Sequence, residues 1–106
     1  ALVSLITVSA CAGYDMCHCT NADGTANNTI TELVCNADIK EGGPRSPLYV
    51  LEEDSIKKCA VNHTIDSTYE LGNCKVRKHC AKLGATGSNS FCEIKVSALE
   101  SAFGHT

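Results

Sequence analysis

Eight cysteines are the residues of this chain with the clearest capacity for covalent chemistry. They are Cys11, Cys17, Cys19, Cys35, Cys59, Cys74, Cys80 and Cys92. An even number of cysteines in a short chain is typical of a disulfide framework formed in an oxidising compartment. Zinc binding is the alternative, since Cys17-His18-Cys19 and His79-Cys80 bring ligand types together, but the C-x₂₋₄-C pairs of structural zinc sites are absent. We therefore predict four disulfides and no metal site, and the spacing leaves their connectivity open.

The histidines are the candidates for acid–base catalysis. They are scattered along the sequence as His18, His63, His79 and His105. A small secreted ribonuclease would need a constellation of His, Glu and Arg, for which His63, Glu70 and Arg77 are available, although nothing in their spacing compels it. We predict a protein without catalytic residues and without a cofactor, and a ribonuclease-like hydrolase is the enzymatic alternative.

Two kinds of surface feature could carry modifications or interactions. The sequons Asn27-Asn28-Thr29 and Asn62-His63-Thr64 make Asn27 and Asn62 candidate glycosylation sites, with capping and turn roles as the alternative. Basic residues of a predicted helix form a candidate interaction patch for anionic lipid headgroups, phosphate or an acidic partner. They are Lys75, Arg77, Lys78 and Lys82. The alternative for these four residues is a solvated helix face.

Length and composition exclude several classes of protein. A chain of 106 residues fits a single domain with one modest core. Its hydrophobic content of 43% argues against intrinsic disorder, and no apolar run is long enough for a transmembrane helix. The net charge of −3 argues against nucleic-acid binding as the main task, because phosphate binding needs concentrated positive charge.

The first ten residues are uncharged and contain several β-branched side chains. They are either the remnant of a signal peptide or a strand of the mature protein. We favour the strand, because a positive n-region is missing and cleavage after the small-residue motif at 10–12 would remove Cys11.

Two helices are predicted from apolar spacing and capping signals. The first covers residues 28–38, with Thr29 and Glu32 as a capping box. The second covers residues 67–83, or begins near Asn73 because a glycine precedes it.

Alternating side chains predict the strands. They lie at residues 14–20, 48–51, 57–65 and 91–96. In the third, Ile65 is expected on the same side as Cys59, and in the last, Ile94 on the same side as Cys92. The resulting order of strand, helix, strand, strand, helix, strand is that of the split βαβ or ferredoxin-like arrangement. We therefore predict an α+β single domain with two helices on one face of an antiparallel sheet.

Several motifs together point to a known family. Cys11-Ala12-Gly13-Tyr14 is followed by Cys17-His18-Cys19-Thr20, and then by a turn and a helix that carries Cys35. Lys78-His79-Cys80 and, in the last strand, Cys92 complete the pattern. The chain resembles the alpha subunit of the smut-fungus killer toxin called killer protein six, and the small secreted cysteine-rich fungal effectors that share its fold. Cys74 has no counterpart in the toxin.

The resemblance implies an α/β sandwich, secretion and action at the surface of a competing or host cell, without catalytic residues. We expect a secreted, virulence-associated effector that acts on host plant cells or on extracellular targets in the apoplast. Its partner would be a host or target-cell protein or surface component, and a partner subunit or a homo-oligomer is a further expectation. The alternative is an antimicrobial killer-toxin subunit that acts on competing fungi.

Overall fold

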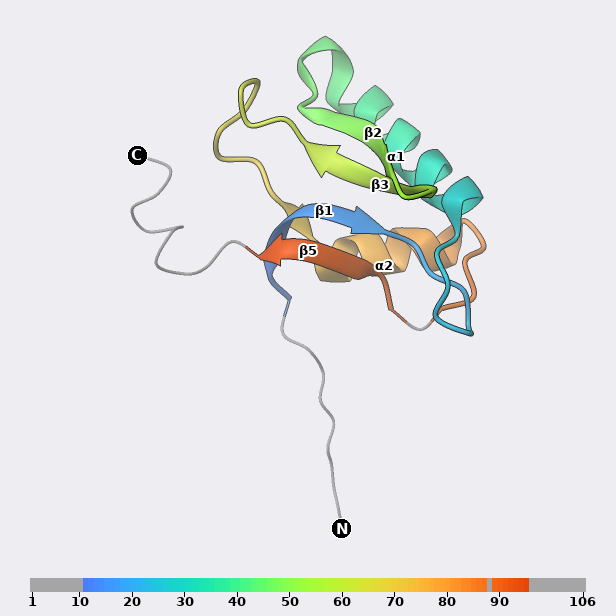
Figure 1. Cartoon of the computed structure of the whole chain (residues 1–106). Coiled ribbons are helices and arrows are strands. Elements are labelled where there is room, and N and C mark those ends of the chain that lie inside the picture. Colours follow the sequence, from blue (N-terminus) through green and yellow to red (C-terminus); the bar gives the residue numbers. More distant parts are fainter. Residues whose placement is uncertain (1–10, 88, 96–106) are drawn as a thin grey trace.

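The computed structural model describes residues 11–87 and 89–95, with Lys95 described by its backbone alone. The strand predicted over residues 1–10, Val96 and the C-terminal tail lie outside the described residues. Within them, the chain forms an α+β domain of two layers, a sheet and a pair of helices (Figure 1). The predicted α+β class and the antiparallel sheet with two helices are confirmed.

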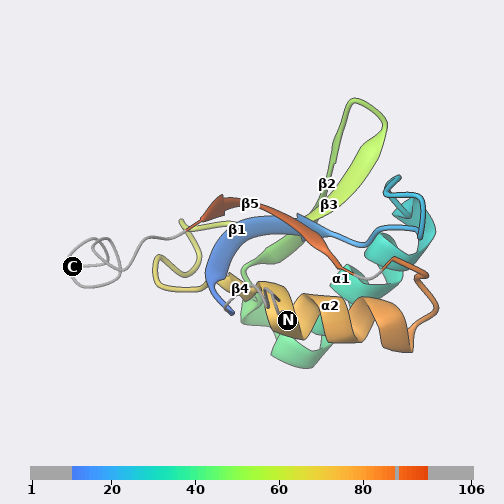
Figure 2. The same ribbon diagram turned by 90° about the horizontal axis from the view of Figure 1, so that it is seen from below.

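The sheet contains five strands, and every paired neighbour is antiparallel. Their bounds are Gly13–His18 for β1, Leu48–Glu53 for β2, Ile56–Val61 for β3, Leu71–Gly72 for β4 and Phe91–Lys95 for β5. β1 pairs with β3, β4 and β5, so it occupies the centre of the sheet. β2 and β3 form a hairpin that projects beyond the other strands (Figure 2).

Both α-helices cover the same face of the sheet (Figure 2). α1 runs over Asn28–Gly42 and packs on β2 and β3, and α2 runs over Asn73–Lys82 and packs on β1. A short 3₁₀ turn at Gly43–Arg45 connects α1 to β2. The other face of β1, β3 and β5 carries no helix from the described part of the chain.

All eight cysteines are paired, which confirms the predicted four disulfides and excludes zinc binding by their thiols. The bridges are Cys11–Cys74, Cys17–Cys92, Cys19–Cys80 and Cys35–Cys59. Cys35–Cys59 joins α1 to β3, and Cys17–Cys92 joins the neighbouring strands β1 and β5. The other two bridges join α2 to the segments that flank β1. Both helices are therefore covalently attached to the sheet layer.

Sulfur and aliphatic side chains fill the space between the sheet and the helices. The buried half-cystines are Cys17, Cys19, Cys35, Cys59 and Cys80. The buried aliphatic residues of this core cluster are Val34, Leu48, Val61, Leu71 and Val76. No Phe or Tyr is fully buried among the described residues, so the disulfides occupy positions where other cores place aromatic rings. Thr31 is also buried, and its hydroxyl accepts a hydrogen bond from the Cys19 N–H at 2.9 Å.

The residue that caps α1 differs from the predicted one. The N-cap is Asn27, whose side-chain oxygen accepts a hydrogen bond from the Ile30 N–H at 2.9 Å. The capping box predicted at Thr29 and Glu32 is wrong, because Glu32 is instead paired with Lys57 of β3 at 2.9 Å. A contact between distant segments thus outcompetes the local pattern.

Two helix boundaries also differ from the simplest sequence pattern. α1 continues beyond Asp38 to Gly42, and it ends where Gly43 takes a φ of +73°, a left-handed conformation that favours glycine. α2 begins at Asn73, the later of the two predicted starts. The reason is that Leu71–Gly72 pair with β1 and form β4.

Two expected strand faces are wrong. β3 ends at Val61, so Ile65 lies in the following turn and is 55% exposed. In β5, Ile94 has a φ of +62° and is 59% exposed, so it does not share the inward face with Cys92. A left-handed residue interrupts the alternation of a strand, and the sequence alone does not reveal its position.

Candidate functional site

The face of the sheet opposite the helices carries a groove of about 650 Å³. Side chains of β1, β3 and β5 line it together with the β2–β3 turn, the loop at residues 24–26 and Asn28, the first residue of α1. We call it the sheet groove. It is defined by His18, Asp54, Lys58, Phe91 and Glu93. None of these residues was proposed as a site from the sequence, apart from His18 among the scattered histidines.

The disulfides determine which side chains face the sheet groove. Cys92, Cys17 and Cys59 lie in one row across β5, β1 and β3, and Cys59 points toward α1, to which it is bonded. Side chains alternate along a strand, so the neighbours of these cysteines point to the opposite face. His18 and Phe91 are direct partners in the register, and their rings stack with centroids 5.2 Å apart.

His18 forms the buried end of the sheet groove. The residue is 8% exposed, and its Nδ1 has no hydrogen-bond partner among the described atoms. Burial lowers the pKa of His18, against the opposing effect of Glu93, while Lys58 lowers it further. The imidazole is therefore neutral at pH 7 and packs as a flat ring beneath Phe91. Phe91 itself is 55% exposed, so an aromatic ring held in place from one side remains open to solvent.

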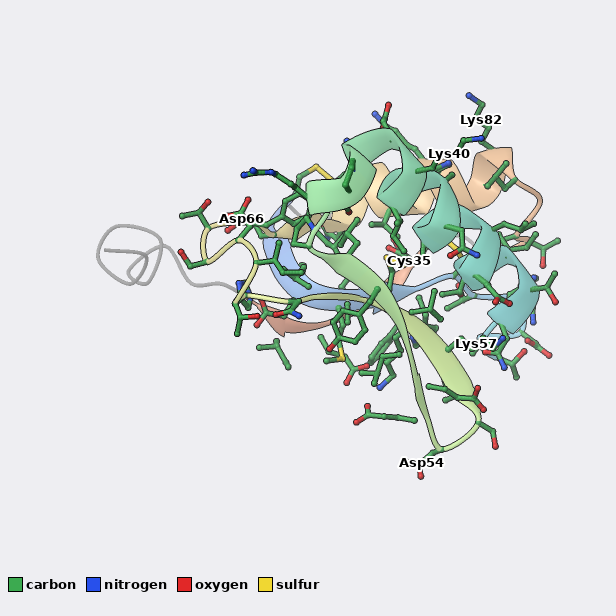
Figure 3. All side chains as sticks on the ribbon, turned by 90° about the horizontal axis from the view of Figure 1, so that it is seen from above. Cys35, Lys40, Asp54, Lys57, Asp66 and Lys82 are labelled. Atoms are coloured by element: carbon green, nitrogen blue, oxygen red, sulfur yellow. A yellow bond between two sulfur atoms is a disulfide. The ribbon has the colours of Figure 1, made fainter. Side chains whose placement is uncertain are left out.

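Lys58 supplies the positive charge at the sheet groove, and carboxylates surround it. Its Nζ lies 2.8 Å from Glu93 Oε2 and 3.1 Å from Glu53 Oε1. The hydrogen bonds to Glu93 and Glu53 raise the pKa of Lys58. Asp54 adds another carboxylate at the tip of the β2–β3 hairpin (Figure 3). Two carboxylates are therefore paired with one ammonium group, Asp54 lines the same groove, and the local charge is negative.

A second polar cluster lies between α1 and α2. His79 Nδ1 and Asp38 Oδ1 are 3.4 Å apart, and burial raises the pKa of Asp38 although His79 and Lys75 oppose this effect. Next to them is a smaller hollow of about 240 Å³, which Asp66 and Tyr69 also line. Its lining carries charges of both signs, from Asp38, Glu41 and Asp66 and from Arg45 and Lys75.

The four basic residues proposed as a patch are distributed around α2. Lys75, Lys78 and Lys82 are exposed and share one side of the helix, at the spacing expected for neighbours on a helix surface. Lys75 also lines the hollow next to Asp38. Arg77 is half-buried and two positions away from Lys75, so it lies off that side. The interaction proposed for this patch stays a prediction.

The residues available for a ribonuclease are not connected in the structure. His63 Nε2 is hydrogen-bonded to Asp15 Oδ1 at 2.7 Å. No hydrogen bond or ion pair among the described residues joins His63, Glu70 or Arg77 to one another. His105 lies outside the described residues. Within residues 11–87 and 89–95, no group of three His, Cys, Asp or Glu side chains is placed to hold a metal ion.

The two sequons have different environments. Asn27 uses both ends of its amide, because its Oδ1 caps α1 and its Nδ2 donates to Asn21 Oδ1 at 2.9 Å. Asn62 Oδ1 accepts hydrogen bonds from the N–H and the hydroxyl of Thr64. Its Nδ2 has no hydrogen-bond partner among the described residues. Capping and turn roles therefore apply to both sites, and only Asn62 keeps its amide nitrogen free.

Comparison with known proteins gave no match to a family model, to a curated protein or to a solved structure. No helix in the described part of the chain combines the length and the apolar character that a membrane crossing needs.

The sequence signal that could have revealed the sheet groove is the pairing of Cys17 with Cys92. Once these two cysteines are known to be bonded across neighbouring strands, their neighbours His18 and Phe91 must lie together on the other face. Sequence spacing leaves the disulfide connectivity open, so it does not predict that His18 and Phe91 lie together.

Proposed function

We propose that this protein is a secreted, non-enzymatic effector with a killer-toxin-like domain, which acts by binding a component of a host plant cell or an extracellular host target. The observation that carries the proposal is the sheet groove, in which the exposed ring of Phe91 stands on the buried ring of His18. Aromatic side chains fixed at the surface are typical anchors of protein interfaces. The four disulfides support secretion, because such bridges persist in oxidising compartments.

The proposal includes a ferredoxin-like arrangement of the domain. The strand order β5, β1, β3, β2 with antiparallel neighbours supports it, as do the two helices on one face. The short strand β4 is an addition to that arrangement. The motifs around Cys11 and Cys17 support a relation to the killer-toxin family.

The direct test is infiltration of the purified, fully bridged protein into leaf tissue of candidate hosts. We expect a tissue response that Phe91→Ala abolishes. Ile65→Ala is the matched control, because Ile65 is as exposed as Phe91, at 55%, and lies away from the sheet groove. Growth inhibition of competing fungi without a response of host tissue would replace the proposal with the killer-toxin alternative. Inactivity in both assays would overturn it.

A ribonuclease-like hydrolase is the second candidate, and a specific observation favours it. His18, Lys58 and Glu93 lie together in the sheet groove beside Phe91, which could stack on a base. The excess of carboxylates opposes this function, because it repels a phosphodiester. Cleavage of RNA that is lost in His18→Ala would establish the hydrolase, and full resistance of RNA to the protein would remove it.

A further inference from the structure

We infer that the sheet groove binds an arginine side chain of the partner protein. The inference rests on the proposed binding function and names the chemistry of the partner at that site. A guanidinium group fits this site because the sheet groove combines a flat aromatic surface with an excess of carboxylates. Each of these features is matched by a different property of arginine.

The aromatic surface is the exposed ring of Phe91. One side of this ring stacks on His18 at a centroid distance of 5.2 Å with 27° between the planes, which restricts its motion. The ring lines the sheet groove and is 55% exposed, which leaves ring surface for a planar group. A guanidinium group placed over an aromatic face gains both stacking and cation–π attraction.

The carboxylates lie around the same opening. Glu93 uses Oε2 to bind Lys58, and its Oε1 makes no hydrogen bond or ion pair with the described residues. Asp54 lies at the hairpin tip and likewise has no ion pair among them (Figure 3). The five donors of a guanidinium group fit carboxylate acceptors, often in pairs of parallel hydrogen bonds.

The charges of the sheet groove favour a cation over the competing classes of ligand. Lys58 is the one lysine or arginine among the described residues that line the sheet groove. Its ammonium group already forms ion pairs with Glu53 and Glu93. A phosphate or an acidic peptide would therefore meet repulsion from Asp54 and Glu93. A neutral sugar would stack on the Phe91 ring and donate hydroxyl hydrogen bonds to the carboxylates, but it has no positive charge to balance them. A lysine side chain would gain the charge but lacks the planar group that stacks on the ring.

The test is a nuclear magnetic resonance titration of the full, bridged chain with N-acetyl-arginine amide. We expect saturable shifts at the signals of Phe91, His18 and Glu93, with a dissociation constant on the order of millimolar for this small probe. N-acetyl-citrulline amide has the same shape without the charge, and we expect at least a tenfold weaker effect. N-acetyl-lysine amide should bind more weakly than the arginine probe.

Variants separate the two parts of the site. Phe91→Ala should remove the shifts, and Asp54→Asn should weaken binding several-fold while an Asn tolerates the φ of +51° at this position. Ile65→Ala should leave the titration unchanged. Equal binding of citrulline, no shift at Phe91, or tighter binding of inorganic phosphate or glucose would each overturn the inference. If the arginine probe fails while Phe91→Ala still abolishes the tissue response, the inference falls and the proposed function stands. If the arginine probe binds but the protein causes no tissue response, the proposed function falls and the arginine site stands.

Discussion

Cys17 of β1 and Cys92 of β5 face each other directly across the sheet, with Cα atoms 4.0 Å apart and their sulfurs bonded. Cys59 is the partner of Cys17 on the other side, and its own bridge leads to α1. This row of cysteines orients the strands so that His18 and Phe91 come together on the opposite face. The same strand register therefore places the bonded cysteines in the core and the side chains of the sheet groove on the opposite face.

Removal of the Cys17–Cys92 bridge should cost less than its sequence separation of 75 residues suggests. Because Cys19–Cys80 already joins the same segments, the ring that Cys17–Cys92 closes is only about 15 residues long. For the double variant Cys17→Ala/Cys92→Ala, we expect a loss of about 3 kcal/mol in the free energy of unfolding, measured by urea denaturation. The matched control is Cys35→Ala/Cys59→Ala, whose separation of 24 residues is not shortened by another bridge and predicts a loss of about 3.5 kcal/mol. A much larger loss for the first variant than for the second would contradict the account.

Asn27 should be the residue that stabilises the start of α1. Asn27→Ala removes the hydrogen bond to the Ile30 N–H, and we expect a loss of about 1 kcal/mol in the free energy of unfolding. Thr29→Ala is the control, because Thr29 was the expected cap and is exposed at the helix start; its effect should stay within about 0.5 kcal/mol. Both changes remove the same sequon, so a glycan cannot explain the difference. Equal losses would show that Asn27 does not act as the cap.

The His63–Asp15 pair should make stability depend on pH. The hydrogen bond to Asp15 raises the pKa of His63 above its ordinary value of 6.5, although partial desolvation opposes it. A raised pKa in the folded state gives a stabilisation that is fully present below the ordinary pKa and is lost as pH rises through the raised one. The stability difference between wild type and His63→Gln should therefore be larger at about pH 6 than at about pH 8.5, as measured by urea denaturation.

Asp15→Asn serves as the control for this pH effect. It removes the partner that holds the proton on His63, so the extra stability near pH 6 should disappear in this variant as well. A difference between wild type and His63→Gln that stays constant with pH would assign the pair to packing alone.

Asn62 should carry a glycan when the protein is secreted from eukaryotic cells, whereas Asn27 should not. The amide nitrogen of Asn62 has no hydrogen-bond partner among the described residues, whereas that of Asn27 donates a hydrogen bond to Asn21 Oδ1. Mass spectrometry of the secreted protein should show a glycan that Asn62→Gln removes and Asn27→Gln leaves in place. A glycan on Asn27 alone would reverse the assignment.

Local patterns were sufficient to predict much of this fold and failed where distant contacts decide. The alternation around Cys17 and the apolar spacing of α1 predicted a strand and a helix in the right places, because these signals lie within a few residues. The start of α2 depended on Leu71, which pairs with Tyr14 far away in sequence. Likewise, Glu32 looked like part of a cap but pairs with Lys57. No window of neighbouring residues contains these partners.

The candidate site was harder to predict than the fold. His18, Lys58 and Phe91 come from three strands, and only the register of those strands brings them together. The sequence singled out histidines by residue type and basic residues by clustering, but the sheet groove depends on an aromatic ring and paired charges. No short sequence motif marks an exposed aromatic ring or a pair of opposite charges.

The connectivity of the bridges has a consequence for proteolysis. Every bridge joins one of the first four cysteines, up to Cys35, to one of the last four, from Cys59 onward. A single cleavage anywhere between Cys35 and Cys59, for example at the exposed hairpin tip beside Asp54, would leave two polypeptides held together by all four bonds. An extracellular protease could thus convert the domain into a covalent two-chain form without releasing either piece.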